Sequence, residues 1–315
     1  MLHIIQLSLL LFTLLLLVGC NPSSYNASDA PNNKISGVVV DGYISGATVC
    51  LDFNYNNSCD KDEPVTSTDA NGSYSFTNFN LKQENTIISV LAYGGIDTAT
   101  NKKFKGQIRN AIEFSKKEQK KDIVISPLTD LVVTHFFTTY ERGVQELHDA
   151  QEVVSSSFEI DKELLSSDPM KSVKLFSVNQ KVHHTEALLQ TLVEKNLLHY
   201  KKSSSRLSIQ TLVKEEILHF GYDIDTILIT LENTINIQLP ENEKVFVTKQ
   251  TKELQSNLTE LTNNTNLSIS TLPALQKRLF NSQYEANDRL YIVDGSYPIE
   301  IVPINLEVSK KSNKL

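Results

Sequence analysis

The sequence predicts an α+β protein of more than one domain: an N-terminal β-sandwich, a mainly α-helical domain, and short C-terminal strands. Three observations predict this fold class. Short β-branched runs separated by Gly and Asn turns fill residues 35–106, and apolar residues at helical spacing fill residues 126–287. Residues 288–315 return to β-rich runs. Division of the 315 residues by about 150 per domain gives about two domains.

The composition favours a folded protein and excludes one functional class. Hydrophobic residues make up 40% and charged residues 21%, which is enough apolar material for a sizeable core. The formal net charge is -7. Binding to phosphates needs an excess of Lys and Arg, so we expect no nucleic-acid partner.

The N-terminus predicts export and lipid attachment. Residues 4–18 are almost all apolar, but the run is shorter than the ~20 residues of a membrane-spanning helix. It ends at Leu17-Val18-Gly19-Cys20, and such a short run ended by small residues is typical of a signal peptide. This ending resembles the lipobox of bacterial lipoproteins, which implies that residues 1–19 are removed and that Cys20 is acylated. The alternatives are a plain secretory signal and an anchor helix.

The same resemblance implies where the protein is held. One acyl chain binds a protein to membranes weakly, whereas two or more anchor it stably. A Cys20 that carries several acyl chains, palmitate among them, therefore implies a membrane-anchored protein. Asn21 follows Cys20, where an Asp would resemble an inner-membrane retention signal. The resemblance therefore favours the outer membrane and leaves open the surface or periplasmic face. Residues 20–34 are rich in Asn, Ser and Pro and predict a flexible tether.

The β domain is predicted from residues 35–106. Strands are expected at 35–41, 47–52, 73–76 and 86–93, because each run is β-branched, apolar or alternating and is bounded by Gly, Asn or Asp. Cys50 and Cys59 remain if Cys20 carries the lipid. Two cysteines in an exported chain predict one disulfide, and the alternative is two free thiols.

Residues 52–63 have the spacing of a 12-residue calcium loop. Oxygen-bearing side chains fall at loop positions 1, 3, 5, 9 and 12, and the carbonyl of position 7 completes the set: Asp52, Asn54, Asn56, Asp60 and Glu63, with Ser58. Asn57 replaces the usual Gly, and Asn is the next best residue for a left-handed turn. The spacing predicts a structural calcium site between strands; the alternative is an acidic loop that needs no ion.

The rest of the chain is predicted as a connector, helices and a tail. Residues 107–125 are Lys-rich and predict a solvated connector. Ser126-Pro127 is typical of a helix start, and apolar stripes at helical spacing follow at 128–136, 188–193, 224–235 and 247–261. In the tail, strands are expected at 290–293 and 299–308, the second at an edge or bulge because of Pro303.

Three consecutive segments of the β domain resemble a family. Residues 36–52, the acidic loop and residues 68–76 (TDANGSYSF) resemble the carboxypeptidase-regulatory-like and SdrD-B-like domains of bacterial surface proteins. The resemblance implies a prealbumin-like or Ig-like sandwich and a role as a stalk, spacer or adhesive module. More loosely, residues 125–132, with 158–161 and 167–170, resemble the helical segment that follows such domains in exported lipoproteins.

Catalytic motifs are not apparent in the sequence. G-x-S-x-G, H-E-x-x-H, P-loop and G-x-G-x-x-G patterns are missing. His183 and His184 with Glu186 form the one His/carboxylate cluster, and we expect them on a solvated helix face. We therefore expect no enzyme but a surface binding or structural module with an unidentified protein or glycan ligand. The second hypothesis is a periplasm-facing assembly factor that binds a protein partner through its helical domain. The third is a hydrolase.

Overall fold

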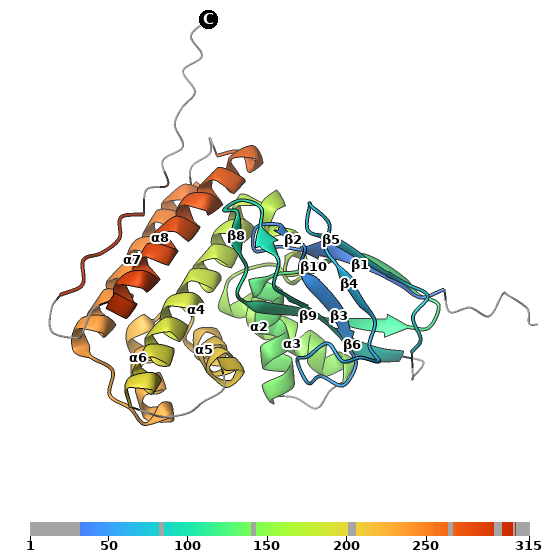
Figure 1. Ribbon diagram of the computed structural model, residues 1–315, viewed down its shortest axis with the longest axis horizontal. Coiled ribbons are helices and arrows are strands. Elements are labelled where there is room, and N and C mark those ends of the chain that lie inside the picture. The colour runs from blue at the N-terminus through green and yellow to red at the C-terminus, as the bar shows by residue number, and fades with distance from the viewer. Residues whose placement is uncertain are drawn as a thin grey trace, which may run out of the picture.

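A computed structural model places an N-terminal region of strands beside a mainly helical C-terminal region (Figure 1). The structure describes residues 32–81, 85–139, 143–200, 206–263, 267–292, 298–304 and 306. The predicted signal peptide, Cys20 and most of the predicted tether lie outside these residues. The end of the tether prediction overlaps the strand region, since Asn33 is buried and donates a hydrogen bond to the Phe79 carbonyl (2.6 Å).

The strand region contains the four strands that the sequence predicts, with slightly different ends, and six further strands among the described residues. Gly and Asn turns separate them, as the sequence pattern requires. Their bounds are β1 Lys34–Val39, β2 Ile44–Ser45, β3 Thr48–Asp52, β4 Val65–Ser67, β5 Ser73–Thr77, β6 Asn85–Tyr93, β7 Ile96–Asp97, β8 Lys102–Lys103, β9 Gln107–Ser115 and β10 Gln119–Ile125.

The strands form sheets in the orders β10-β1-β5, β4-β3-β6-β9 and β2-β7-β8. β6 pairs antiparallel with β3 and β9, whereas β1 pairs antiparallel with β5 and parallel with β10. One apolar cluster contains side chains from the β10-β1-β5 sheet and from the β4-β3-β6-β9 sheet, so these two sheets share a core. Its members include Ile35, Val39, Val49, Leu51, Phe76, Ile88, Val90, Phe114 and Ile125.

The predicted connector at residues 107–125 is wrong, because β9 and β10 occupy it. The lysines that suggested a solvated segment lie at the turn between the two strands and at exposed or partly exposed positions of β10. The apolar residues between them are buried in the sheets: Ile108, Ile112, Phe114, Val124 and Ile125. The strand region therefore runs on to the residue before the first described helix.

The helical region has the periodic helices that the sequence predicts. Ser126 caps the first of them, since its Oγ accepts a hydrogen bond from the Thr129 N–H (3.3 Å). The bounds are α2 Pro127–Thr139, α3 Val144–Ser157, α4 Val173–His199, α5 Arg206–Phe220, α6 Ile224–Ile235, α7 Glu241–Asn263 and α8 Leu272–Ile292, with short 3-10 turns at Lys162–Leu164, Pro169–Lys171 and Ile269–Thr271. Among these described helices, none combines the length and apolar character needed to cross a bilayer.

The helices pack directly on the sheet that contains β6 and β9. Successive side chains of a strand point to opposite faces, so Ile88 and Val90 enter the core between the sheets while Ile87 joins the helical core. Ala111 of β9 joins it in the same way, and α2 lies against β9. This sheet is therefore covered on both faces.

The predicted C-terminal strands are absent from the described residues. Residues 290–292 continue α8, because Leu290 extends a buried stripe at helical spacing that includes Leu275, Leu279 and Ala286. Residues 298–304 form no strand. They run along α7 instead: the Gln250 amide donates to the Val302 carbonyl (2.9 Å) and accepts from its N–H (2.8 Å). Residues 293, 305 and 307–308 of these predictions lie outside the described residues.

Candidate functional site

The acidic loop joins β3 to β4, and Glu63, the last predicted ligand, contacts the start of the loop. The Glu63 carboxylate is almost completely buried and accepts hydrogen bonds from the N–H groups of Phe53 (2.8 Å) and Asp60 (3.0 Å). Asp52, at the end of β3, accepts from the N–H groups of Asn56 (3.2 Å) and Asn57 (3.0 Å). Loop positions 1 and 12 therefore both point into the interior of the loop.

The remaining predicted ligands meet at Asp60. Its Oδ2 accepts hydrogen bonds from the side-chain amides of Asn54 (2.7 Å) and Asn56 (2.8 Å). Ser58, predicted to supply a carbonyl, contributes its N–H to Asn56 Oδ1 (2.8 Å). The structure thus brings the predicted ligand residues into one connected network of contacts.

The left-handed turn expected at Asn57 is present, with a φ of 60°. Tyr55 also has a positive φ, 61°, and the two residues curl the loop around its polar side chains. The predicted disulfide is present as well: Cys50 in β3 is bonded to Cys59 in the loop. This bond fixes the loop to the sheet and, by the chain-entropy argument, stabilises the fold by about 2–3 kcal/mol.

The charge of the loop is only partly compensated. Burial and the nearby charge of Glu63 raise the pKa of Asp52, although backbone N–H groups act in the opposite direction. Across the described residues, no group of three or more His, Cys, Asp or Glu side chains forms a metal cluster.

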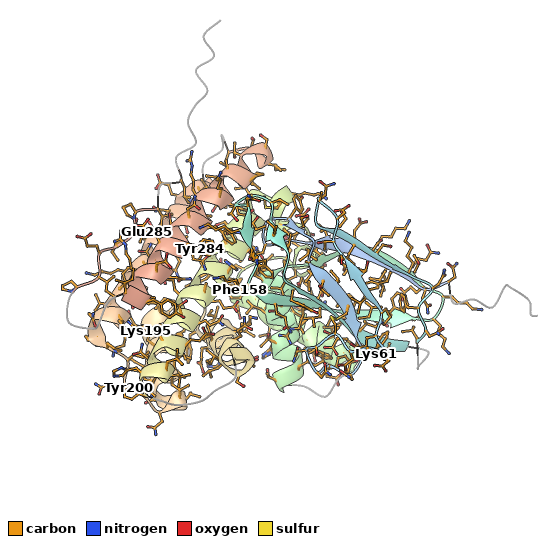
Figure 2. The ribbon with its side chains drawn as sticks, viewed as in Figure 1. Lys61, Phe158, Lys195, Tyr200, Tyr284 and Glu285 are labelled. Atoms are coloured by element: carbon orange, nitrogen blue, oxygen red, sulfur yellow. A yellow bond between two sulfur atoms is a disulfide. The ribbon has the colours of Figure 1, made fainter. Side chains whose placement is uncertain are left out.

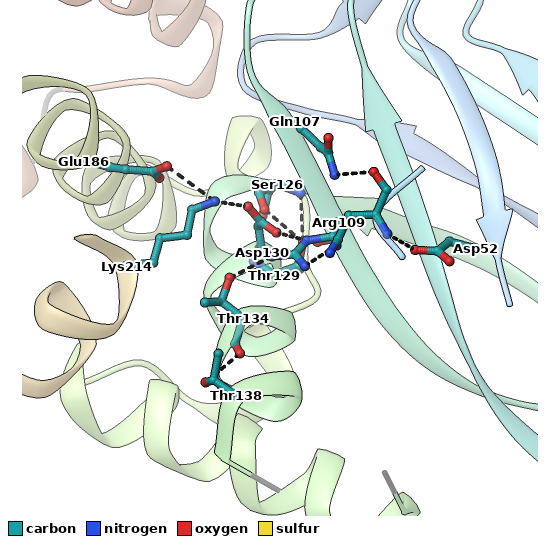
Figure 3. A network of polar contacts seen from close by, with 11 residues as sticks. Asp52, Gln107, Arg109, Ser126, Thr129, Asp130, Thr134, Thr138, Glu186 and Lys214 are labelled. Atoms are coloured by element: carbon teal, nitrogen blue, oxygen red, sulfur yellow. Dashed lines mark hydrogen bonds and ion pairs between the residues drawn. The ribbon is translucent and has the colours of Figure 1, made fainter. Parts of the chain in front are cut away.

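The loop is connected to the helical region through Arg109 of β9 (Figure 3). The Arg109 guanidinium donates to Asn57 Oδ1 (2.6 Å), to Asp130 Oδ1 on α2 (2.6 Å) and to Thr134 Oγ1 (2.8 Å). Gln107 makes a second connection, since its amide donates to the Asn57 carbonyl (3.2 Å). Asn57 therefore has two roles, as a turn residue and as an acceptor for β9.

Asp130 links Arg109 to a second buried cation. Its other oxygen is paired with the ammonium of Lys214 on α5, which also lies 3.3 Å from Glu186 on α4. Burial alone would raise the pKa of Asp130, but Arg109 and Lys214 outweigh it and lower that pKa. Burial raises the pKa of Glu186 and outweighs the opposite effects of Lys214 and His183. The four charged side chains come from four elements and join the strands to the helices.

The prediction that His183 and His184 lie on a solvated helix face is wrong. His184 is buried and lies 3.2 Å from the side-chain oxygen of Gln180. His183 Nδ1 lies 2.9 Å from the fully buried Asp41 carboxylate at the end of β1, and its ring stacks on Phe280 at 5.0 Å. The pair is therefore part of the contact between α4, α8 and the strand region.

The two histidines have opposite pKa shifts. Burial alone would lower the pKa of His183, but the Asp41 and Glu186 carboxylates hold it above its ordinary 6.5. Burial and the neighbouring His183 charge hold the pKa of His184 well below that value. The raised pKa favours the protonated form of the partly buried His183 beside Asp41, and the lowered pKa favours the neutral form of the buried His184.

These shifts predict a pH dependence of stability. A basic group whose pKa rises on folding stabilises the folded protein. The stabilisation is complete at pH values below the pKa of the group in the unfolded chain, and it is lost as the pH rises through its pKa in the folded protein. The His183–Asp41 pair should thus lose its contribution above about pH 6.5. We expect His183→Gln to flatten the decline of Tm over this range in thermal melts at stepped pH. An unchanged slope in the variant would contradict the assignment, and His148→Gln, outside this contact, is the control.

The chain matches no family model, no curated protein and no solved structure.

Proposed function

We propose that the chain is a membrane-anchored bacterial lipoprotein that acts as a non-catalytic surface binding or structural module. The observation that carries this proposal is Leu17-Val18-Gly19-Cys20 at the end of a short apolar run, followed by a polar tether. A lipid on Cys20 would hold the strand and helical regions at an outer membrane. The direct contact between those two regions supports a single rigid module at the end of that tether.

We further propose that the strand region is an Ig-like or prealbumin-like sandwich related to carboxypeptidase-regulatory-like domains. Two sheets that share one core support this fold. The G-A-x-V strand at residues 46–49 leads into β3 and the acidic loop, and the T-D-x-x-G-x-Y-x-F segment at 68–76 contains β5. The parallel pairing of β1 with β10 is a feature that the resemblance did not lead us to expect.

A structural calcium ion in the 52–63 loop is part of the proposal. Calcium prefers several oxygen ligands in a flexible arrangement, and hydrogen bonds connect three carboxylates and two side-chain amides within this loop. The raised pKa of Asp52 supports a cation here, because buried negative charge favours one. The ion would order the loop that Arg109 and Gln107 connect to the helices.

The calcium prediction is tested by thermal melts of the oxidised protein. With free calcium at 100 times its Kd, we expect stabilisation of about 2.7 kcal/mol, and chelation should abolish it. Glu63→Gln removes the buried carboxylate that closes the loop and should abolish the calcium response. Asp62→Asn changes the exposed neighbouring acid and should retain it. If neither calcium nor chelator changes the Tm of the wild-type protein, the proposed calcium site is wrong.

Lipid attachment is tested at Cys20. We expect the wild-type chain to incorporate a palmitate analogue and to sediment with membranes. Cys20→Ser should lose both properties, whereas Ser23→Ala, three residues further along, should keep both. Label on the Cys20→Ser chain, or a membrane-free wild-type chain, would contradict the anchor.

A further inference from the structure

A cleft of about 310 Å³ lies between the strand region and two long helices. One wall is the segment from β8 to the start of β9, and the other is formed by α4 and α8. In Figure 1, β8 lies next to α4 and α8, and Tyr284 of α8 is labelled in Figure 2. The volume is at the lower end of the range for small-molecule sites, so it suits a small ligand.

The two walls carry opposite net charge, with the buried Asp97 also on the strand wall and His183, which faces Asp41, also on the helical wall. Lys103 and Lys105 lie on the strand wall, and both are exposed. Within the part of the chain that the structure describes, neither lysine forms an ion pair. Glu186, Glu194 and Asp288 line the helical wall. Separated cations and carboxylates across one cleft complement a ligand that carries one charge of each sign.

The space between the charged groups is lined by aromatic rings and by a buried acceptor that has no hydrogen-bond partner among the described residues. Phe104, Phe280 and Tyr284 line the cleft. The ammonium of Lys102 already lies 3.8 Å from the centre of the Tyr284 ring, so this ring takes a cation on one face. The buried Oδ1 of Asn287 lines the same cleft and has no hydrogen-bond partner among the described residues. A buried acceptor without a partner is costly, and a ligand N–H would satisfy it.

We propose that this cleft binds a small zwitterion with an apolar or aromatic body, such as an amino acid or a short peptide. The ligand's carboxylate faces Lys103 and Lys105, and its ammonium faces Glu194 and Asp288. Its N–H donors reach Asn287 Oδ1, and its apolar body lies against the aromatic rings. The inference gives the proposed binding module a ligand class, but it uses no residue of the lipid anchor or the calcium loop.

The test uses a matched set of three dipeptides with the full chain in lipid nanodiscs. Glycyl-L-phenylalanine has both charges, its C-terminal amide has only the ammonium, and its N-acetyl derivative has only the carboxylate. In isothermal titration with empty nanodiscs as the blank, we expect the zwitterion to bind. Each singly charged analogue should bind at least about tenfold more weakly, because it loses a charge-assisted contact. The absence of any heat of binding at millimolar zwitterion overturns the proposal. Equal binding of all three dipeptides also overturns it.

Variants assign each charge to its wall. Lys103→Met/Lys105→Met should weaken the zwitterion about tenfold and leave the amide analogue unaffected. Asp288→Asn should weaken the zwitterion and leave the acetyl analogue unaffected. Lys120→Met/Lys121→Met on β10 and Glu285→Gln on α8 do not line the cleft and should bind like the wild type. If a cleft variant loses the same affinity for all three dipeptides, the assignment of the ligand's two charges to the two walls is overturned. A failed palmitate assay with intact peptide binding would instead overturn only the anchor.

Discussion

Replacement of Asp130 by Ala is expected to destabilise the protein by about 3–5 kcal/mol, the cost of breaking a buried charge pair. Asp130 has no exposed side-chain surface and lies between Arg109 and Lys214, whose side chains are only 6% and 4% exposed. Its loss leaves two buried cations facing each other without their shared anion. Urea unfolding at neutral pH measures the effect as a lower midpoint.

The control for Asp130 is an ion pair of the same type at the surface. Asp225 pairs with Lys252, and the two side chains are 63% and 58% exposed. Asp225→Ala should cost no more than about 1 kcal/mol. In a double-mutant cycle, Asp130→Ala and Lys214→Met should be strongly non-additive, because they remove the two partners of one contact. Similar losses at Asp130 and Asp225 would contradict the buried network.

Replacement of Gly37 by Ala is expected to cost about 3 kcal/mol, at the upper end for overpacking of a core. Gly37 lies on β1 opposite Ile123 of β10, where the register between the strands shifts. An added Cβ would lie 1.8 Å from the Ile123 carbonyl oxygen, which is backbone and has little freedom to move. The two strands must therefore separate.

The Gly37 variant is measured by thermal unfolding and by amide hydrogen exchange of β10. Ser36→Ala, one residue earlier on the same strand, is the matched control and should stay within about 0.5–1 kcal/mol of wild type. Increased exchange should concentrate at Ile123 and Val124, which pair with β1. If Gly37→Ala behaves like Ser36→Ala, the parallel pairing of β1 with β10 is wrong.

Local patterns in the sequence predicted local structure well. β1, β3, β5 and β6 follow β-branched or alternating runs ended by turn residues, and the α2 start follows from Ser126-Pro127. β9 and β10 were missed because the lysines at their turn dominated the average composition. β10 also owes its place to β1, which lies some 80 residues earlier. A local pattern cannot reveal such a partner.

The same distinction applies to the candidate sites. The acidic loop was recognised because its members lie within one short segment, and the Cys50–Cys59 bond was predicted because only two cysteines remain once Cys20 is assigned to the lipid. The Arg109–Asp130–Lys214–Glu186 network was missed because it joins four separate elements. Its one local signal is Asp130, a carboxylate inside the apolar run of α2. His183 was assigned to solvent because the sequence does not show that Asp41 packs against it.

Protease shaving of intact cells tests whether the proposed lipid-anchored module is displayed on the cell surface. The helical region is followed with an antibody, and lysed cells serve as the control. We expect protease on intact cells to cut the chain and to remove the module from the cells. Protection until lysis would contradict surface display, place the module on the periplasmic side, and favour an assembly factor that binds a partner within the envelope.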